Sequence, residues 1–307
     1  MRAVGYGMVT AGSVLWGLNG PVSRMALDAG VEPRQLAGWR VLSAALLMTG
    51  VLAVLRRAQF RCGRRALVSI AAFGLFGVTL PQWLYYEAIS RFDVGLTLVI
   101  VYTAPLWVAG IHRVTREQRQ PRQVSAAMGL ALVGVAIAVL GGGGLGSGSV
   151  LGLALAVGTS LAYTAQLMLA DRLDTSLPAS SRLALSMAFG AVFWLLLPSV
   201  RDLPTHLLRS DVPFGQLDVK VPLLLLIGYV VLGGTITPYA FLVGGVSRIG
   251  PVAAGVTGMI EPLIAITLGW ALLGQSLSVI QGLGIALVLA CVLTSERARS
   301  RALAVPA

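Results

Sequence analysis

The segment VTGMIEPLIAITL, residues 256–268, places Glu261 directly before Pro262 within an otherwise apolar run. An ionisable side chain at the centre of a bilayer is costly, so such a residue normally faces protein or water rather than lipid. The proline beside it removes one backbone hydrogen bond from a helix. The pair predicts a functional site inside a membrane segment, and the rest of the chain is expected to enclose that site.

The apolar runs define the class of protein. Of the 307 residues, 56% are hydrophobic and only 11% are charged, whereas a soluble domain carries roughly 25% charged residues. Many of the runs are about 20 residues long, which is the length that crosses a hydrocarbon core. The chain is therefore predicted to be an all-α integral membrane protein with ten transmembrane helices, at 5–23, 36–55, 66–88, 94–112, 124–140, 150–170, 183–198, 221–243, 251–272 and 278–294.

The basic residues predict the orientation of these helices. The formal net charge is +11, but the arginines lie mostly in short gaps between apolar runs, which argues against a nucleic-acid partner. With a cytoplasmic N-terminus, 16 of the 23 basic residues fall in cytoplasmic segments and 6 in outer segments, while Arg40 lies within a span. Because positive charge is enriched on the cytoplasmic side, both termini are predicted to be cytoplasmic.

A glycine-rich segment, residues 141–149, divides the chain. It lacks the Lys-Ser/Thr ending of a phosphate-binding loop and follows no strand, so it is interpreted as a flexible linker. The two cysteines, Cys62 and Cys291, do not have the spacing of a metal site or a disulfide framework. We therefore expect no cofactor, no metal and, without a nucleophile or His-Glu-x-x-His motif, no catalytic site.

The two halves of the chain repeat each other. Three pairs of landmarks lie 157 residues apart: Pro81 with Pro238, Arg91 with Arg248, and Pro105 with Pro262. The predicted organisation is a first repeat at 1–140, the linker, a second repeat at 150–294 and a cytoplasmic tail at 295–307. Since each repeat holds five spans, an odd number, the second repeat is predicted to be inverted in the membrane, as in alternating-access transporters.

Prolines within the spans predict hinges around a cavity. Four of them, Pro21, Pro81, Pro238 and Pro262, follow a glycine by four residues, whereas Pro105 follows Val101. The residue four positions before a proline is the one whose carbonyl loses its partner. A glycine at that position, such as Gly258, lets the helix bend and leaves the carbonyl open to another group.

These features together resemble one known group of proteins. Ten spans, two repeats, the segment WGLNGP at 16–21, Arg40 near the start of the second span and Glu261-Pro262 are similar to the drug/metabolite transporter superfamily, EamA type. The resemblance covers essentially the whole chain. It implies a ten-helix inverted-repeat fold in the bacterial inner membrane and export of small metabolites or toxic compounds, often coupled to protons. The chain departs from a symmetric site at Ala104, which stands where the second repeat has Glu261.

Polar and aromatic side chains within the spans are candidates for lining a cavity. Glu261 is a candidate for reversible protonation or solute contact, and a packing carboxylate is the alternative. Arg40 is a candidate for holding a solute carboxylate or for pairing with Glu87 or Glu261, and the alternative is that it snorkels to the interface. The other candidates for solute or proton binding are Asn19, Gln82, Gln166, Trp16, Tyr85, Tyr102, Tyr163 and Tyr239.

The sequence thus favours a secondary transporter in the cell membrane that exports a small amphipathic metabolite, such as an amino acid, with a proton as the candidate coupling ion. An uncoupled facilitator and a multidrug exporter remain alternatives. A receptor is disfavoured, because the longest predicted segment outside the spans, 199–220, is short. The expected partners are a small-molecule solute and the lipid bilayer; a monomer is sufficient, and dimerisation is left open.

Overall fold

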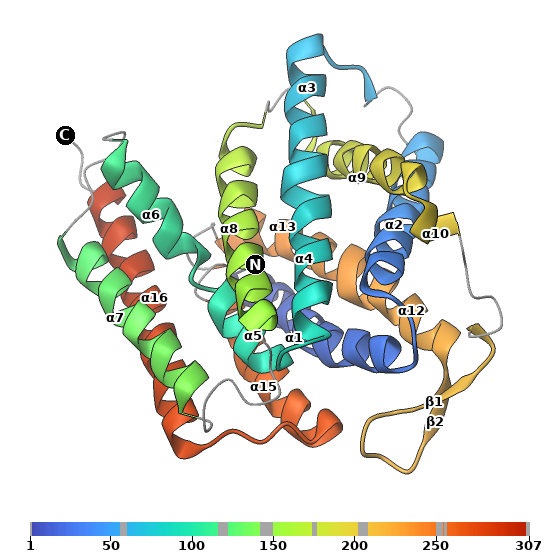
Figure 1. Ribbon diagram of the computed structural model, residues 1–307. Helices are drawn as coiled ribbons and strands as arrows, with labels where there is room; N and C mark the ends of the chain where they lie inside the picture. Colours follow the sequence, from blue (N-terminus) through green and yellow to red (C-terminus); the bar gives the residue numbers. More distant parts are fainter. Residues whose placement is uncertain are drawn as a thin grey trace.

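The computed structural model describes residues 2–55, 60–115, 122–141, 150–173, 177–201, 208–249, 254 and 257–304. Across these residues the chain forms a bundle of helices with one two-stranded hairpin (Figure 1). The predicted linker at 141–149 lies outside the described residues except for Gly141, and residues 305–307 of the predicted tail lie outside them as well.

The helices of the first half follow the predicted spans closely. The third span is one continuous helical segment in which α3 and α4 flank a π-helix, η2, and the fourth span is broken into α5 and α6. The bounds are α1 Arg2–Asp28, α2 Pro33–Leu55, α3 Arg64–Ala72, η2 Phe73–Thr79, α4 Leu80–Ile89, α5 Val94–Val101, α6 Ala104–Val114 and α7 Arg122–Leu140.

The second half repeats this pattern. Its third span again contains a π-helix, η3, and α15 again begins a few residues before a proline. The bounds are α8 Val150–Asp171, α9 Ala179–Leu196, α10 Pro198–Arg201, α12 Leu223–Val231, η3 Leu232–Ile236, α13 Thr237–Ile249, α15 Ile260–Leu273 and α16 Val279–Ala304.

Most of these segments are apolar enough to lie in a membrane. In the part of the chain that the structure describes, five are also long enough to cross one: Pro33–Val54, Arg64–Ile89, Val150–Ala170, Ala179–Leu196 and Leu223–Ile249. Shorter apolar helices are Val94–Val108, Gly129–Leu140, Ile260–Leu273 and Val279–Thr294. All of these overlap predicted spans, and α1 overlaps the first. The count of ten crossings and the orientation of the termini stay predictions.

The 157-residue spacing is visible in the backbone itself. Each π-helix ends two residues before a proline, η2 before Pro81 and η3 before Pro238. A π-helix carries one extra residue in a turn and is typical of functional positions in helices. The helix breaks also correspond, because α6 begins one residue before Pro105 and α15 begins two residues before Pro262.

A repeated serine and arginine close the third span of each half. The hydroxyl of Ser90 donates to the carbonyl of Glu87 at 2.9 Å, and Arg91 Nη1 donates to the same oxygen at 2.8 Å. In the second half, Ser247 and Arg248 donate to the carbonyl of Gly244 at 2.9 and 2.6 Å. Both arrangements satisfy a carbonyl in the last turn of a helix, which explains physically why Ser-Arg recurs.

Besides the π-helices and the break between α5 and α6, two further features were not predicted from the sequence. A short antiparallel hairpin, β1 Asp211–Pro213 with β2 Lys220–Pro222, lies within the segment interpreted as a loop. In its turn, the backbone N–H of Gln216 donates to the carbonyl of Leu272 at 2.8 Å, which satisfies an acceptor near the C-terminus of α15. In addition, α16 continues to Ala304, ten residues beyond the predicted end at 294, because Ala, Arg and Glu in that stretch favour helix.

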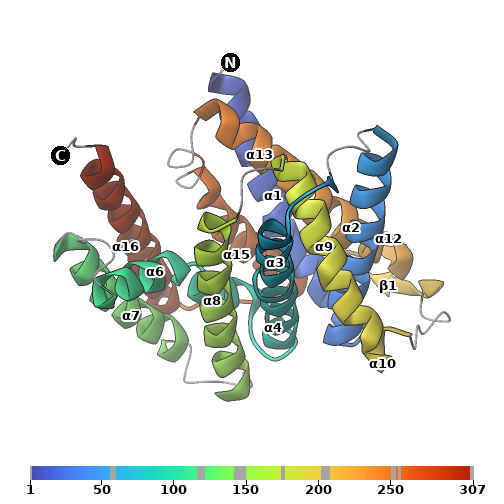
Figure 2. The ribbon, with the colours of Figure 1, turned by 90° about the horizontal axis from the view of Figure 1, so that it is seen from above.

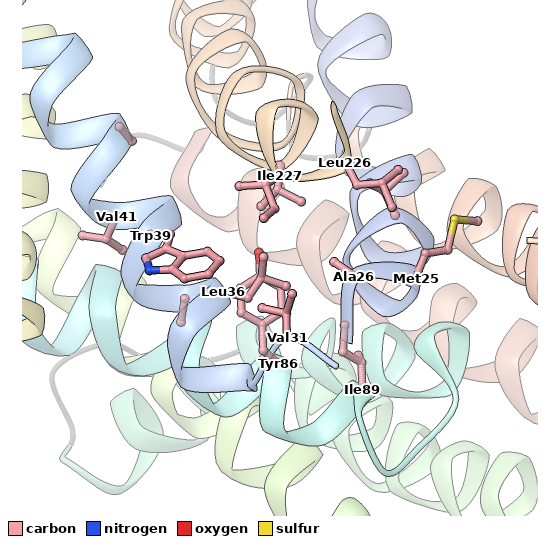
Figure 3. Packing of buried hydrophobic residues seen from close by; sticks show 14 of the residues in the cluster. Met25, Ala26, Val31, Leu36, Trp39, Val41, Tyr86, Ile89, Leu226 and Ile227 are labelled. Atoms are coloured by element: carbon pink, nitrogen blue, oxygen red, sulfur yellow. The ribbon is translucent and has the colours of Figure 1, made fainter. Parts of the chain in front are cut away.

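The largest buried cluster joins the two halves. It packs α1, α2 and α4 of the first half against α12 of the second (Figure 3), and its fully buried members include Leu36, Tyr86 and Ile89. In the turned view, α10 lies toward the opposite edge of the molecule from the start of α1 (Figure 2).

The last helices of the two repeats, α7 and α16, lie side by side at one flank of the bundle in both views (Figures 1 and 2). Glycines permit their close approach. A Cβ on Gly284 would lie 2.6 Å from the carbonyl oxygen of Gly134, and a Cβ on Gly134 would lie 2.9 Å from the carbonyl oxygen of Gly284. Small residues at such a contact provide van der Waals packing where no hydrophobic effect is available.

This contact makes a prediction for stability. Gly284→Ala should destabilise the protein by about 1–3 kcal/mol, the usual cost of overpacking, and lower the midpoint of thermal unfolding in detergent. The matched control is Gly282→Ala on the same helix, where a Cβ would meet nothing within 4 Å. The control should leave the midpoint unchanged or raise it, since alanine favours helix over glycine. Equal midpoints for the two variants would contradict the close contact.

Candidate functional site

The structure contains a partly open cavity of about 110 Å³ between the two halves of the chain. Its walls come from α1, α2, η2, α4, α5, α8, α13 and α15. The lining residues are Trp16, Asn19, Arg40, Gly77, Val78, Pro81, Gln82, Tyr85, Leu98, Val101, Tyr102, Thr159, Tyr163, Gln166, Tyr239 and Glu261. All ten side chains singled out from the sequence for solute or proton binding therefore lie around one cavity, although the role of each stays a prediction.

Six lining residues were not among those ten. Gly77, Val78, Leu98 and Val101 are small or apolar, so their types do not separate them from residues that face lipid or the core. Thr159 lies on α8 and bonds its hydroxyl back to Leu155 at 2.8 Å, as threonines in helices commonly do. The sixth, Pro81, was predicted as a hinge. Only packing against distant segments places these residues at the cavity.

Glu261 lies in the first turn of α15, where the N-terminal end of the helix dipole favours a negative charge. Its Oε2 accepts a hydrogen bond of 2.8 Å from the hydroxyl of Tyr102. Tyr102 directly follows α5 in the first half, at the break before α6. The two broken helices therefore meet through this bond, which joins the repeats at the cavity.

Two carbonyl groups that lie four residues before a proline are used for inter-repeat contacts. The residue four positions after Gly258 is Pro262, which has no N–H, and the Tyr102 hydroxyl lies 3.3 Å from the Gly258 carbonyl oxygen. Gly234 precedes Pro238 in the same way, and its carbonyl accepts from Trp16 Nε1 at 3.1 Å and from Arg40 Nη2 at 2.7 Å. All three donors belong to the first half of the chain, and both acceptors to the second.

Arg40 is buried, with 6% of its surface exposed, and each of its three nitrogens donates within the protein. Besides Gly234, it donates from Nε to the Thr235 hydroxyl at 2.6 Å and from Nη1 to the Tyr86 hydroxyl at 2.7 Å. Its guanidinium carbon lies 5.8 Å from the centre of the Tyr86 ring. Among the described residues it forms no ion pair, so the structure shows neither of the carboxylate pairings considered for it.

Glu87, the other acidic residue of the predicted spans, lies at the end of α4 outside the cavity lining. Its carboxylate pairs with Arg91 and lies 3.8 Å from the Nε of Arg34. Its Oε1 also accepts from Trp83 Nε1 at 3.2 Å. The carboxylate is thus compensated by nearby donors, in contrast to Glu261, whose charge no arginine or lysine among the described residues pairs directly.

The three amide side chains at the cavity have unused acceptors. The side-chain oxygens of Asn19, Gln82 and Gln166 are buried without a hydrogen-bond partner among the described residues. A buried polar group without a partner costs about 1–3 kcal/mol. Gln166 also hydrogen-bonds the hydroxyl of Tyr239, whose ring packs edge-on against Trp16 with centroids 5.2 Å apart. Such an arrangement offers aromatic walls and spare polar groups to a small ligand.

The predicted hinge prolines fall into three settings. Pro21 lies within the uninterrupted helix α1, Pro81 and Pro238 follow the two π-helices, and Pro105 and Pro262 lie in the first turns of α6 and α15. A proline is tolerated in a first turn because the N–H there lacks an intrahelical partner anyway. Of these irregular segments, η2 with Pro81 and the breaks beside Tyr102 and Glu261 adjoin the cavity, whereas no residue of η3 lines it. Whether any of them bends in function stays a prediction.

The chemistry available at the cavity is binding and proton exchange. Among the described residues, no group of three or more histidine, cysteine, aspartate or glutamate side chains is placed to hold a metal ion. Glu261 can carry a negative charge or a proton, and the tyrosines and the tryptophan supply rings and hydroxyl or indole groups.

The fold and this cavity define a class: a multi-pass membrane protein built from two repeats whose broken helices surround a central site, as in secondary transporters. Residues 3–140 and 150–295 match the EamA-like transporter family. The chain belongs to this family of membrane transporters, within the drug/metabolite transporter superfamily.

Comparison with solved structures supports the same fold. One crystal structure, described only as that of a protein, aligns over 92% of this chain and 96% of its own with a TM-score of 0.53 and 15% sequence identity. A comparison with curated proteins finds no match. Identity at this level shows the fold and leaves the solute to be argued from the cavity itself.

The bond between the two broken helices can be tested without a ligand. Tyr102→Phe leaves the Glu261 carboxylate short of a donor, so we expect a loss of about 1–3 kcal/mol in stability, measured as a lower midpoint of thermal unfolding in detergent. The control is Tyr163→Phe, since the Tyr163 ring lines the same cavity and its hydroxyl makes no hydrogen bond to the described residues. A Tyr102 variant as stable as this control would show that the bond contributes nothing.

Proposed function

We propose that this protein is a secondary active transporter of the cell membrane that exports a small amphipathic metabolite by alternating access, coupled to protons. In this proposal ten transmembrane helices form two inverted repeats, and both termini are cytoplasmic. The observation that carries the proposal is the position of Glu261, a partly buried carboxylate at the cavity that is held by a hydrogen bond from the other repeat.

The proposed coupling uses the cost of moving a charge through the membrane. Tyr102 satisfies one oxygen of Glu261, and the other is available to a proton or to an N–H group of the solute. Either partner compensates the negative charge and so lowers the cost of carrying the carboxylate past the low-dielectric middle of the bilayer. The cavity can then change the side of the membrane to which it opens while the negative charge of Glu261 is compensated.

The other cavity residues would set selectivity. Trp16, Tyr85, Tyr163 and Tyr239 provide flat apolar walls, and the amides of Asn19, Gln82 and Gln166 provide hydrogen bonds. The cavity volume of about 110 Å³ is below the roughly 300–1,000 Å³ of pockets for drug-sized ligands. This favours a small metabolite over the large compounds that a multidrug exporter carries.

An uncoupled facilitator is the second candidate, and it differs in one respect. A facilitator moves solute only down its gradient, so an imposed pH gradient would drive no accumulation. The paired placement of a carboxylate and a tyrosine at the helix breaks favours coupling, because a facilitator needs no group that changes charge during transport.

The proposal is tested in reconstituted vesicles with candidate small metabolites and an imposed pH gradient. Glu261→Gln should lower the gradient-driven rate by about tenfold or more, equivalent to about 1.4 kcal/mol in activation free energy. It should also abolish the dependence of that rate on the pH gradient, because glutamine cannot exchange a proton.

The matched control for this experiment is Glu87→Gln. Glu87 is also a partly buried glutamate in an apolar span, but it pairs with Arg91 away from the cavity. Its variant should keep the rate within about fivefold of the wild type, as expected for loss of a partly exposed ion pair. Unchanged rate and unchanged pH dependence in Glu261→Gln would refute the role proposed for Glu261.

A further inference from the structure

The two π-helices are equivalent by sequence position, but they are held in different ways. In both, a threonine hydroxyl donates to the carbonyl five residues earlier: Thr79 to Gly74 in η2 and Thr235 to Val230 in η3, each at 2.9 Å. In both segments this bond gives a hydrogen-bond partner to a backbone carbonyl of the widened turn. What differs is the neighbour that each π-helix meets in the second helix of the opposite half.

The π-helix of the first half, η2, meets α9 through close backbone packing. A Cβ on Gly190 of α9 would lie 2.5 Å from the Thr79 hydroxyl, and a Cβ on Gly74 would overlap the backbone carbonyl of Ser186. Glycine is therefore required on both sides of this contact, and no side chain fits between the two segments. Among the described residues η2 itself is held to α9 by close packing, and the Ser186 hydroxyl of α9 donates instead to the Ile70 carbonyl of α3 at 3.3 Å.

The π-helix of the second half, η3, meets α2 through a charged side chain instead. Arg40 of α2 reaches across and donates to the Thr235 hydroxyl at 2.6 Å and to the Gly234 carbonyl at 2.7 Å. The second acceptor, Gly234, lies four residues before Pro238, which has no N–H to donate. Hydrogen bonds from a charged donor are stronger than neutral ones, so this joint is held by two directed bonds rather than by shape.

The third bond of Arg40 ties the same joint to the protein core. Its Nη1 donates to the hydroxyl of Tyr86, whose ring is fully buried in the cluster between α2, α4 and α12 (Figure 3). None of the three acceptors, Tyr86, Gly234 or Thr235, lines the cavity, although Arg40 itself does. The guanidinium thus points its donors into the protein rather than toward a ligand.

We infer that Arg40 is a positioning residue: it locks η3 of the second repeat to α2 and α4 of the first, and so restrains the cavity at Glu261 from opening wider than in this structure. The inference rests on the proposed transport function for its consequence, because opening the cavity then requires the three bonds of Arg40 to rearrange. The lock itself is a property of the ligand-free protein. Thr235 and Tyr86, which the sequence did not single out, are parts of it.

The test measures cavity opening in the absence of any solute. A reporter cysteine replaces Leu98, which lines the cavity, in a background in which Cys62 is replaced by Ser and Cys291 by Ala. Purified protein in vesicles is treated with N-ethylmaleimide, and the rate of alkylation is followed by mass spectrometry. Thr235→Val and Tyr86→Phe should each raise the alkylation rate about tenfold, the size expected for loss of one hydrogen bond to a charged group.

Two matched controls distinguish loss of the Arg40 hydrogen bonds from a general loss of packing. Thr235→Ser keeps the hydroxyl and should alkylate at the rate of the parent protein. Thr79→Val removes the equivalent hydroxyl from η2, where no arginine binds, and should also leave the rate unchanged. Arg40→Lys should raise the rate as Thr235→Val does, since lysine lacks the planar fork that reaches three acceptors. If Arg40→Lys does not fold, the inference is decided by Tyr86→Phe and by the comparison of Thr235→Val with Thr235→Ser.

The competing role, Arg40 as a ligand contact, gives the opposite result. In that case Thr235→Val and Tyr86→Phe would alkylate at the parental rate, and Arg40→Lys would only raise the KM for transport; this outcome would overturn the inference. If Arg40 instead holds η3 in position, Thr235→Val, Tyr86→Phe and Arg40→Lys change the maximal transport rate and leave KM within about twofold of the wild-type value. Absence of transport by the wild type would refute the proposed function but would leave the alkylation result and its meaning intact.

Discussion

The hydrogen bond from Tyr102 to Glu261 is the interaction on which the centre of this molecule depends. A carboxylate in an apolar membrane segment has to face protein or water and find a partner, and here that partner comes from the opposite half of the chain. The bond is possible because both halves break a helix at equivalent positions. One break presents the tyrosine and the other presents the first turn of α15.

The repeats supply a symmetric frame, and single residues make it asymmetric. The prolines at the helix breaks, the ends of the π-helices and the Ser-Arg helix ends recur at a spacing of 157 residues. Glu261 has only Ala104 in the equivalent position, and the two π-helices are held by glycine packing in one case and by Arg40 in the other. In this account the symmetric parts allow two related conformations, and the asymmetric residues make the exchange between them depend on a proton or solute.

Much of this arrangement could be predicted from the sequence, because polar and charged residues that are energetically costly in a membrane are easy to recognise in apolar segments. A glutamate, an arginine and three amides inside predicted spans have few alternatives to facing one another or a cavity, and the structure brings all of them to one cavity. The spacing of the prolines likewise predicted two repeats, which the family match over both halves supports.

Other features depend on contacts that no local pattern contains. Leu98 and Val101 have the same residue types as core and lipid-facing positions, so only tertiary packing identifies them as cavity walls. The partners of Arg40 were not predictable either, since Thr235 and Tyr86 lie 195 and 46 residues away in sequence. The π-helices differ from α-helices by one residue in a turn, which hydrophobic periodicity over such a short stretch does not resolve.

The central claim is that the Glu261 carboxylate faces each side of the membrane in turn. It is tested most directly with a water-soluble carbodiimide and an amine nucleophile, applied to one side or the other of sealed vesicles that contain oriented protein. Modification of Glu261 is then quantified by mass spectrometry. The account predicts modification from both sides and protection by a transported solute. Modification from one side only under every condition, or from neither, would contradict alternating access and identify Glu261 as a static packing residue.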